Sequence, residues 1–139
     1  PAIAAFPRAL SGPLQAYLAQ VGRGAGPFPS RNTGQAALAG SWSVWLRPGG
    51  HHVDHVHQEG WISSACYVDL PEAIGNGDRQ GWLRLGRPGT VLAEDLVAEH
   101  WIRPEPGLVV FFPSYMWHGT EPFSGSERRL TIAFDLVPA

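Results

Sequence analysis

From residue 41 onward, the chain is a succession of short strand-like segments separated by glycine and proline, and this pattern limits the fold more than any other feature. β-Branched and aromatic residues are concentrated in these segments, while 13 prolines and 17 glycines favour turns over long helices. Short strands with turns at this density are typical of a sandwich, a jelly roll or a barrel. The expected strands are 41–47, 62–68, 81–85, 108–112 and 129–137.

The first 40 residues have a different pattern. Between Leu10 and Val21 the apolar residues recur at helical spacing, with Ser11 as the expected N-cap and Gly22 as the stop. Residues 22–40 are rich in Gly, Pro, Ser and Asn, so we expect a loop there. The sequence therefore predicts an all-β protein with a minor N-terminal helix. We expect residues 1–40 to pack on a core formed by residues 41–139, as a single domain overall.

Composition argues against several classes of protein. The 139 residues are 44% hydrophobic and only 16% charged, which favours a folded chain over a disordered one. A net charge of −2 gives no reason to expect a nucleic acid or an anionic membrane as partner. No apolar run approaches the roughly 20 residues that span a bilayer. The single Cys66 cannot form an intrachain disulfide, which fits a cytoplasmic location. Because the sequence begins at Pro1, we also expect an upstream domain in the full-length protein.

The most distinctive segment is residues 51–57, which contain four of the six histidines. In an extended chain, side chains at positions i and i+2 point to the same face and can converge on one ion. Two pairs have this spacing, His55 with His57 and His52 with Asp54. Imidazole and carboxylate groups are both ligands of divalent transition metals. The segment therefore predicts a metal site with two possible ligand pairs.

A third ligand is expected from His118, which follows the most apolar strand of the chain. Gly119 next to it permits a close approach of the backbone. Two ligands from one strand and one from a distant strand form one face of an octahedron and leave the opposite positions open. His100 has no partner at ligand spacing, so we interpret it as structural.

Two of the expected strands have one face that is small or polar. These faces carry Arg129, Thr131, Ala133 and Asp135 on residues 129–137, and Ser63, Ala65 and Tyr67 on residues 62–68. Small residues beside an arginine or a tyrosine are what a cavity inside a β-barrel requires, although such faces can also meet solvent. Five tryptophans either wall this cavity or fill the core: Trp45, Trp61, Trp82, Trp101 and Trp117.

These residues also carry a resemblance to a known family. Nearly all of the chain from Ser41 to Pro138 resembles the Fe(II)/2-oxoglutarate oxygenases of bacteria and phage, above all in His55-Val56-His57, Trp117-His118-Gly119-Thr120 and the stretch from Arg129 to Asp135. The resemblance implies a double-stranded β-helix, a jelly-roll fold of cupin type, that binds Fe(II) and 2-oxoglutarate. It further implies hydroxylation of a substrate, a small molecule or a protein, with release of succinate and CO2.

The resemblance also implies roles for individual residues. His118 matches the distal iron ligand, and Arg129 matches the arginine that pairs with the distal carboxylate of 2-oxoglutarate, for which a guanidinium fork is suited. Thr131 and Tyr67 match groups that assist in binding this cosubstrate. Arg128 is the rival of Arg129, and we favour Arg129 because it shares strand parity with Thr131.

The first ligand pair departs from the usual pattern of the family. Most relatives have a His-x-Asp pair, and His52-Val53-Asp54 matches this pattern. The residues around the segment, however, align His55-Val56-His57 with the ligand position of the family. We favour His55 and His57, and His52 with Asp54 remains the alternative. Residues 72–79 and 86–99 are expected to edge the pocket mouth. Two other functions remain open, a cupin-like metal protein that does not use 2-oxoglutarate and a non-enzymatic metal-binding module.

Overall fold

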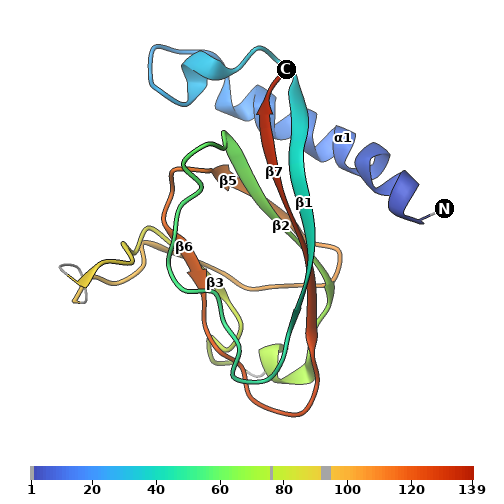
Figure 1. The fold of residues 1–139 in the computed structure, drawn as a ribbon, viewed down its shortest axis with the longest axis vertical. Helices are drawn as coiled ribbons and strands as arrows, with labels where there is room; N and C mark the ends of the chain where they lie inside the picture. Colours follow the sequence, from blue (N-terminus) through green and yellow to red (C-terminus); the bar gives the residue numbers. More distant parts are fainter. Residues whose placement is uncertain (1, 76, 92–94) are drawn as a thin grey trace.

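A computed structural model describes residues 2–75, 77–91 and 95–139, and Figure 1 shows one long helix lying against a β-sheet. This larger sheet has the strand order β1-β7-β2-β5, and every neighbouring pair is antiparallel. Its four strands are β1 (Ala36–Leu46), β2 (Ile62–Asp69), β5 (Val109–Pro113) and β7 (Arg129–Pro138).

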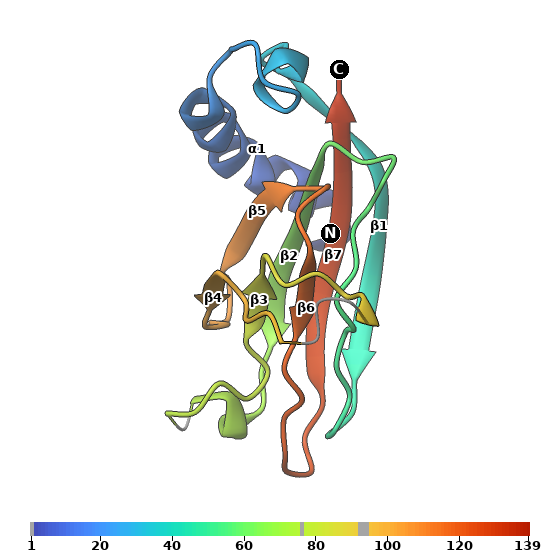
Figure 2. The same ribbon diagram turned by 90° about the vertical axis from the view of Figure 1, so that its left-hand side faces the viewer.

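A smaller sheet with the order β4-β3-β6 faces the larger one, as Figure 2 shows. Its strands are β3 (Leu83–Leu85), β4 (His100–Ile102) and β6 (His118–Thr120). Leu83 and Leu85 pack between the sheets against buried side chains of the larger sheet. Two antiparallel sheets closed over a common interior confirm the predicted all-β jelly-roll fold with one helix.

The register of β2 on β7 decides which side chains face the interior. It pairs Ser63 with Asp135, Ala65 with Ala133, and Tyr67 with Thr131. Directly paired residues project from the same face of a sheet, so the small and polar faces predicted from the two strands lie side by side. The prediction that they border a cavity is confirmed, because a cavity between the sheets is lined by both of them.

Helix α1 (Ala2–Val21) covers the outer face of the larger sheet (Figure 1). It begins well before Leu10, the predicted start, and contains both Pro7 and Pro13. Phe6 continues the apolar stripe onto the core, and this packing outweighs the cost of the prolines. Ser11 is therefore not an N-cap but lies inside the helix, where its Oγ donates to the Arg8 carbonyl at 2.8 Å.

The predicted end of the helix is confirmed. Gly22 has a φ of +64° and donates its amide to the carbonyl of Leu18 at 3.1 Å, as expected for a glycine that stops a helix. Among the described residues, no helix combines the length and the apolar character needed to cross a membrane.

Several strand boundaries differ from the predictions because pairing, not local propensity, decides them. β1 begins at Ala36, within the predicted loop, and this first part pairs with the end of β7 although alanine and glycine disfavour strands. β4 and β6 were not predicted, because each is a three-residue segment that pairs only with β3. Two short 3-10 helices complete the described elements, Pro29–Arg31 and Glu72–Gly75.

Candidate functional site

Backbone hydrogen bonds pair two histidines that are distant in the sequence. His55 and His118 form an isolated antiparallel bridge, in which each amide donates to the carbonyl of the other at 3.0 Å. The amide of His57 donates to the carbonyl of Ser114 at 2.9 Å and continues the contact. Opposed residues in an antiparallel pair project to the same side, so the three imidazoles are directed to one point.

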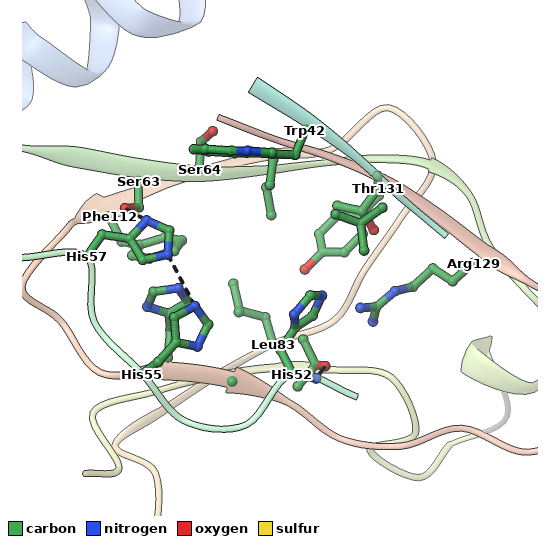
Figure 3. Close-up of a pocket in the computed structure, with 17 residues that line it drawn as sticks. Trp42, His52, His55, His57, Ser63, Ser64, Leu83, Phe112, Arg129 and Thr131 are labelled. Atoms are coloured by element: carbon green, nitrogen blue, oxygen red, sulfur yellow. Dashed lines mark hydrogen bonds between the residues drawn. The ribbon is translucent and has the colours of Figure 1, made fainter. Parts of the chain in front are cut away.

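The three histidine side chains form a compact group. Each offers a ring nitrogen, and the three nitrogens lie within 4.8 Å of one another. The Nε2 atoms of His55 and His57 are 3.1 Å apart, as the dashed line in Figure 3 indicates, and the ring centroids of His55 and His118 are 4.2 Å apart. Imidazole nitrogens at this spacing can hold one transition-metal ion. The structure thus brings together the three favoured candidates.

The opposite nitrogen of each ring has a hydrogen-bond acceptor. Nδ1 of His55 lies 2.7 Å from the Val53 carbonyl, and Nδ1 of His118 lies 3.0 Å from the Met116 carbonyl. Nδ1 of His57 lies 2.7 Å from Oδ2 of Asp135. An imidazole that donates through Nδ1 leaves the lone pair of Nε2 free for a metal, so these acceptors select the tautomer and the ring orientation.

The electrostatic surroundings favour neutral imidazole and ionised carboxylate. Burial lowers the pKa of His118 to about 4, so this side chain is neutral at physiological pH. Burial by itself raises the pKa of Asp135, but hydrogen bonds from His57 and Ser63 outweigh it and lower the pKa overall. A metal ligand must be a deprotonated imidazole, and burial keeps His118 in that form.

The alternative pair, His52 with Asp54, is not assembled. Both oxygens of Asp54 are used by arginines, Oδ1 by Arg84 Nε at 2.7 Å and Oδ2 by Arg87 Nε at 2.7 Å, and the Asp54 side chain is only 5% exposed. Gly119 passes so close that a Cβ atom there would meet Oδ1 of Asp54 at 2.5 Å. The predicted close approach at Gly119 is therefore confirmed, but it serves this ion-pair network.

A cavity of about 290 Å³ extends from the three histidines to Arg129. Figure 3 shows His55 and His57 on one side of it and Arg129 on the other, with Thr131 and His52 between them. The triad occupies what we call the histidine end of this cavity. Arg129, Tyr67 and Thr131 form what we call the arginine end.

The arginine end contains buried polar atoms without partners. Arg129 is only 1% exposed, and its Nη1 donates to the Gly81 carbonyl at 3.0 Å. Its Nε, the hydroxyl of Tyr67 and the Oγ1 of Thr131 are buried and have no hydrogen-bond partner in the part of the chain that the structure describes. Arg128, by contrast, is exposed. Buried polar groups of this kind are suited to a polar ligand, because leaving them unpaired costs free energy.

Both ionisable groups at this end are in hydrogen-bond donor form. Burial raises the pKa of Tyr67 to about 12, so its phenol keeps its proton. Burial lowers the pKa of Arg129, with the nearby Tyr67 opposing the shift, yet an arginine stays charged in proteins. The arginine end therefore presents a positive charge and hydroxyl donors, which is what a carboxylate requires.

The cavity wall includes residues that the sequence analysis did not select. Trp42 and Val44 line it from β1, where they pair with Ala133 and Thr131. They can be identified as cavity residues only from the pairing of β1 with β7, which places them on the same face as Ala133 and Thr131. No described residue of 72–79 or 86–99, the two segments expected at the mouth, is among the lining residues.

The tryptophans selected from the sequence do not form the cavity wall. Trp61 is 1% exposed, packs in the core and donates its indole N–H to the Phe28 carbonyl at 3.0 Å, whereas Trp45 is 55% exposed. None of the five is among the described residues that line the cavity. His100 is exposed on β4 and takes no part in the histidine group.

A sequence model of the family described as "Putative 2OG-Fe(II) oxygenase" matches residues 40–135. The chain belongs to this oxygenase family. The cofactors of the family are Fe(II) and 2-oxoglutarate, and the residues present fit both. The three oriented imidazoles can hold the metal, and the unpartnered donors around Arg129 suit a carboxylate.

Similarity to one solved structure agrees with the jelly-roll fold. A prolyl-4-hydroxylase from Pseudomonas putida superposes with a TM-score of 0.51 at 19% identity, over 71% of this chain and 52% of that one. The chain thus spans about half the length of this hydroxylase. KdgF from Halomonas sp. has a TM-score of 0.40 at 15% identity, over 76% of this chain and 80% of that one. No curated protein sequence matches the chain.

Proposed function

We propose that this protein hydroxylates a substrate with O2 in a reaction that depends on Fe(II) and 2-oxoglutarate and releases succinate and CO2. One observation carries the proposal: a single cavity has three convergent histidines at one end and a buried arginine with unpartnered donors at the other. Membership of the 2OG-Fe(II) oxygenase family supports it.

In this proposal, His55, His57 and His118 hold Fe(II) through Nε2, and Arg129 binds the distal carboxylate of 2-oxoglutarate. Thr131 and Tyr67 donate hydrogen bonds from their hydroxyls to the same carboxylate. The anion would neutralise the buried guanidinium and satisfy the unpartnered donors, which is a strong reason for it to bind there.

The bound metal with its cosubstrate supplies the oxidising chemistry, and the protein supplies position and a dry environment. Leu83 and Phe112, both buried, are apolar walls of the cavity and exclude water from it. Trp42 is 49% exposed and lines the cavity as well, so we propose that the substrate enters past it. The substrate is a small molecule or a protein, and a net charge of −2 leads us to propose no nucleic-acid partner.

We also propose that the protein works in the cytoplasm. Its single cysteine, Cys66, is buried and unbridged, which fits a reducing compartment.

The test is succinate release from 2-oxoglutarate by untagged protein supplied with Fe(II) and O2. The wild type and Arg128→Ala should form succinate at similar rates, because Arg128 is exposed. Arg129→Ala should be slower by about 100-fold at low 2-oxoglutarate, since losing one partner of a buried charge pair costs about 2–5 kcal/mol.

Two other results would replace the proposal. A metal-loaded protein that neither consumes 2-oxoglutarate nor responds to Arg129→Ala would be a cupin-like protein with different chemistry. A wild type that binds no metal would be a non-enzymatic module.

A further inference from the structure

The candidate metal site has no carboxylate among its three ligand candidates. His55, His57 and His118 are neutral ligands, so a divalent ion bound by them keeps its full charge. A His-x-Asp pair would cancel one unit of that charge. Among the described residues, this charge can therefore be compensated only by an anionic group that contacts one of the three histidines.

Asp135 lies in the position that allows compensation. Its Oδ2 accepts a hydrogen bond from Nδ1 of His57 at 2.7 Å, and its side chain is 15% exposed. The other two histidines of the group use neutral backbone carbonyls as their Nδ1 acceptors. His57, which the family resemblance places at the position of the aspartate in His-x-Asp, is thus the one histidine of the three with an anionic acceptor.

The carboxylate is held by the larger sheet and not by the histidine-rich segment. Ser63 is paired with Asp135 in the β2–β7 register, and its Oγ donates to Oδ1 of Asp135 at 2.8 Å. Ser63 Oγ also lies 2.9 Å from Ser114 Oγ and 3.2 Å from Nδ1 of His57, and Figure 3 shows Ser63 beside His57. Both serines are almost fully buried, at 1% and 0% exposure.

We propose that Asp135 is a positioning residue that supplies, through the imidazole of His57, the negative charge that a His-x-Asp ligand pair carries at the metal itself. The inference rests on the proposed metal site. A carboxylate that accepts a hydrogen bond from Nδ1 makes the opposite nitrogen a stronger metal ligand and fixes the orientation of the ring. In this arrangement the negative charge lies on the residue hydrogen-bonded to the ligand, and not on the ligand itself.

The decisive variant is Asp135→Asn, which keeps an acceptor oxygen for His57 but removes the charge. The probe is Mn²⁺, titrated without 2-oxoglutarate or substrate, and the midpoint potential of the bound iron couple is a second readout. Changes at groups behind a metal ligand typically cost about 10–100-fold in affinity, so Asp135→Asn should weaken Mn²⁺ binding by this factor and raise the potential. Asp69→Asn is the matched control, because it removes an exposed carboxylate from the neighbouring strand and should change neither.

A double-mutant cycle tests whether Asp135 acts through His57. In a His57→Ala background there is no imidazole to carry the effect and no new charge beside Asp135, so adding Asp135→Asn should change Mn²⁺ affinity by about twofold or less, within the ~0.5 kcal/mol expected of uncoupled changes. Equal losses in both backgrounds would overturn the role through His57. Should His57→Ala bind no Mn²⁺, the comparison of Asp135→Asn with the wild type decides alone.

The outcomes are separable from those of the proposed function. Wild-type affinity and potential in Asp135→Asn would show a merely structural aspartate and overturn this inference, while leaving 2-oxoglutarate turnover intact. A protein that binds Mn²⁺ with the predicted dependence on Asp135, but forms no succinate, would keep the inference and refute the proposed function. A wild type that binds no Mn²⁺ would overturn both.

Discussion

The two ends of the cavity differ in how their polar atoms are satisfied. At the histidine end, each imidazole has a hydrogen-bond acceptor for Nδ1 and presents the other nitrogen to its neighbours. At the arginine end, three buried polar atoms have no partner among the described residues. The first end is preorganised by the protein alone, whereas the second carries an unpaired charge whose cost an anionic ligand can offset.

The same contrast appears in the backbone. The histidine end is formed by an irregular segment, which is attached to β6 by the reciprocal bonds between His55 and His118. The arginine end lies on β2 and β7, where regular pairing sets Tyr67 opposite Thr131. The positions of the candidate metal ligands thus depend on a few specific contacts, while the proposed anion site depends on the regular pairing of the sheet.

The largest effect is expected at the histidine end from His118→Ala. Removal of a ligand should weaken Mn²⁺ binding by more than about 100-fold, because changes behind a ligand already cost about 10–100-fold. Titration calorimetry on untagged protein measures this, with His100→Ala as the exposed control. Undiminished binding in the His118 variant would mean that His118 is not a metal ligand.

Arg129→Met should act in opposite directions on stability and on ligand binding. The ligand-free variant should be as stable as the wild type or more stable, because replacing a buried charge by an apolar side chain is often neutral or stabilising by about 1–4 kcal/mol. Stabilisation by added 2-oxoglutarate, measured by thermal unfolding with Mn²⁺ present, should disappear. Arg128→Met should keep it, and a large loss of stability in ligand-free Arg129→Met would identify a structural arginine instead.

Asp54→Ala tests whether Asp54, the acidic member of the alternative ligand pair, belongs to either end. Arg84 and Asp54 are both 5% exposed, so the variant leaves a buried guanidinium with Glu121 as its remaining ion-pair partner. We expect a loss of about 3 kcal/mol in the free energy of unfolding, at the lower end of the cost of breaking a buried pair. Urea unfolding of metal-free protein measures it, with exposed Asp69→Ala as control. A loss of metal affinity equal to that of His118→Ala, without loss of stability, would restore Asp54 as a ligand candidate.

The smallest effect concerns His52, which lies between the two ends. Burial, then the charge of Arg129 and of the neighbouring histidines, lowers its pKa from 6.5 to about 4. The unfolded chain takes up the proton first, so the stability contributed by neutral His52 is complete above pH 6.5 and is lost as the pH falls towards 4. After allowance for partial exposure this amounts to about 1–2 kcal/mol.

His52→Gln should therefore reduce the acid sensitivity of ligand-free protein over this interval. Part of the slope should remain, since the pKa of His118 is lowered in the same way. Denaturant unfolding at a series of pH values measures it, and exposed His51→Gln should leave the slope unchanged. An identical slope in His52→Gln would show that His52 titrates normally in the folded protein.

Much of the fold and most of the candidate site could be predicted because they depend on local patterns. Alternation along residues 129–137 separated Arg129 from Arg128 and placed Thr131 on the same face. The spacing of His55 and His57 was sufficient to mark them as a pair, and Gly22 marked the end of the helix. Each of these signals lies within a few residues, where backbone geometry alone decides direction.

What could not be predicted depends on contacts between distant residues. Trp42 could be assigned to the cavity only from the pairing of β1 with β7, and the start of β1 at Ala36 depends on the same pairing. The start of α1 depends on the core that receives Phe6.

The amino-acid sequence by itself determined a β-rich chain with an oxygenase family pattern and two pairs of possible ligands. Only the tertiary structure placed His55 and His57 beside His118 and bound Asp54 to Arg84 and Arg87, which come from a different part of the chain. It also decided that a carboxylate, Asp135, lies behind His57 across the sheet. Side chains alternate by local rules, but which charges meet is settled by strand register and by the closure of one sheet over the other.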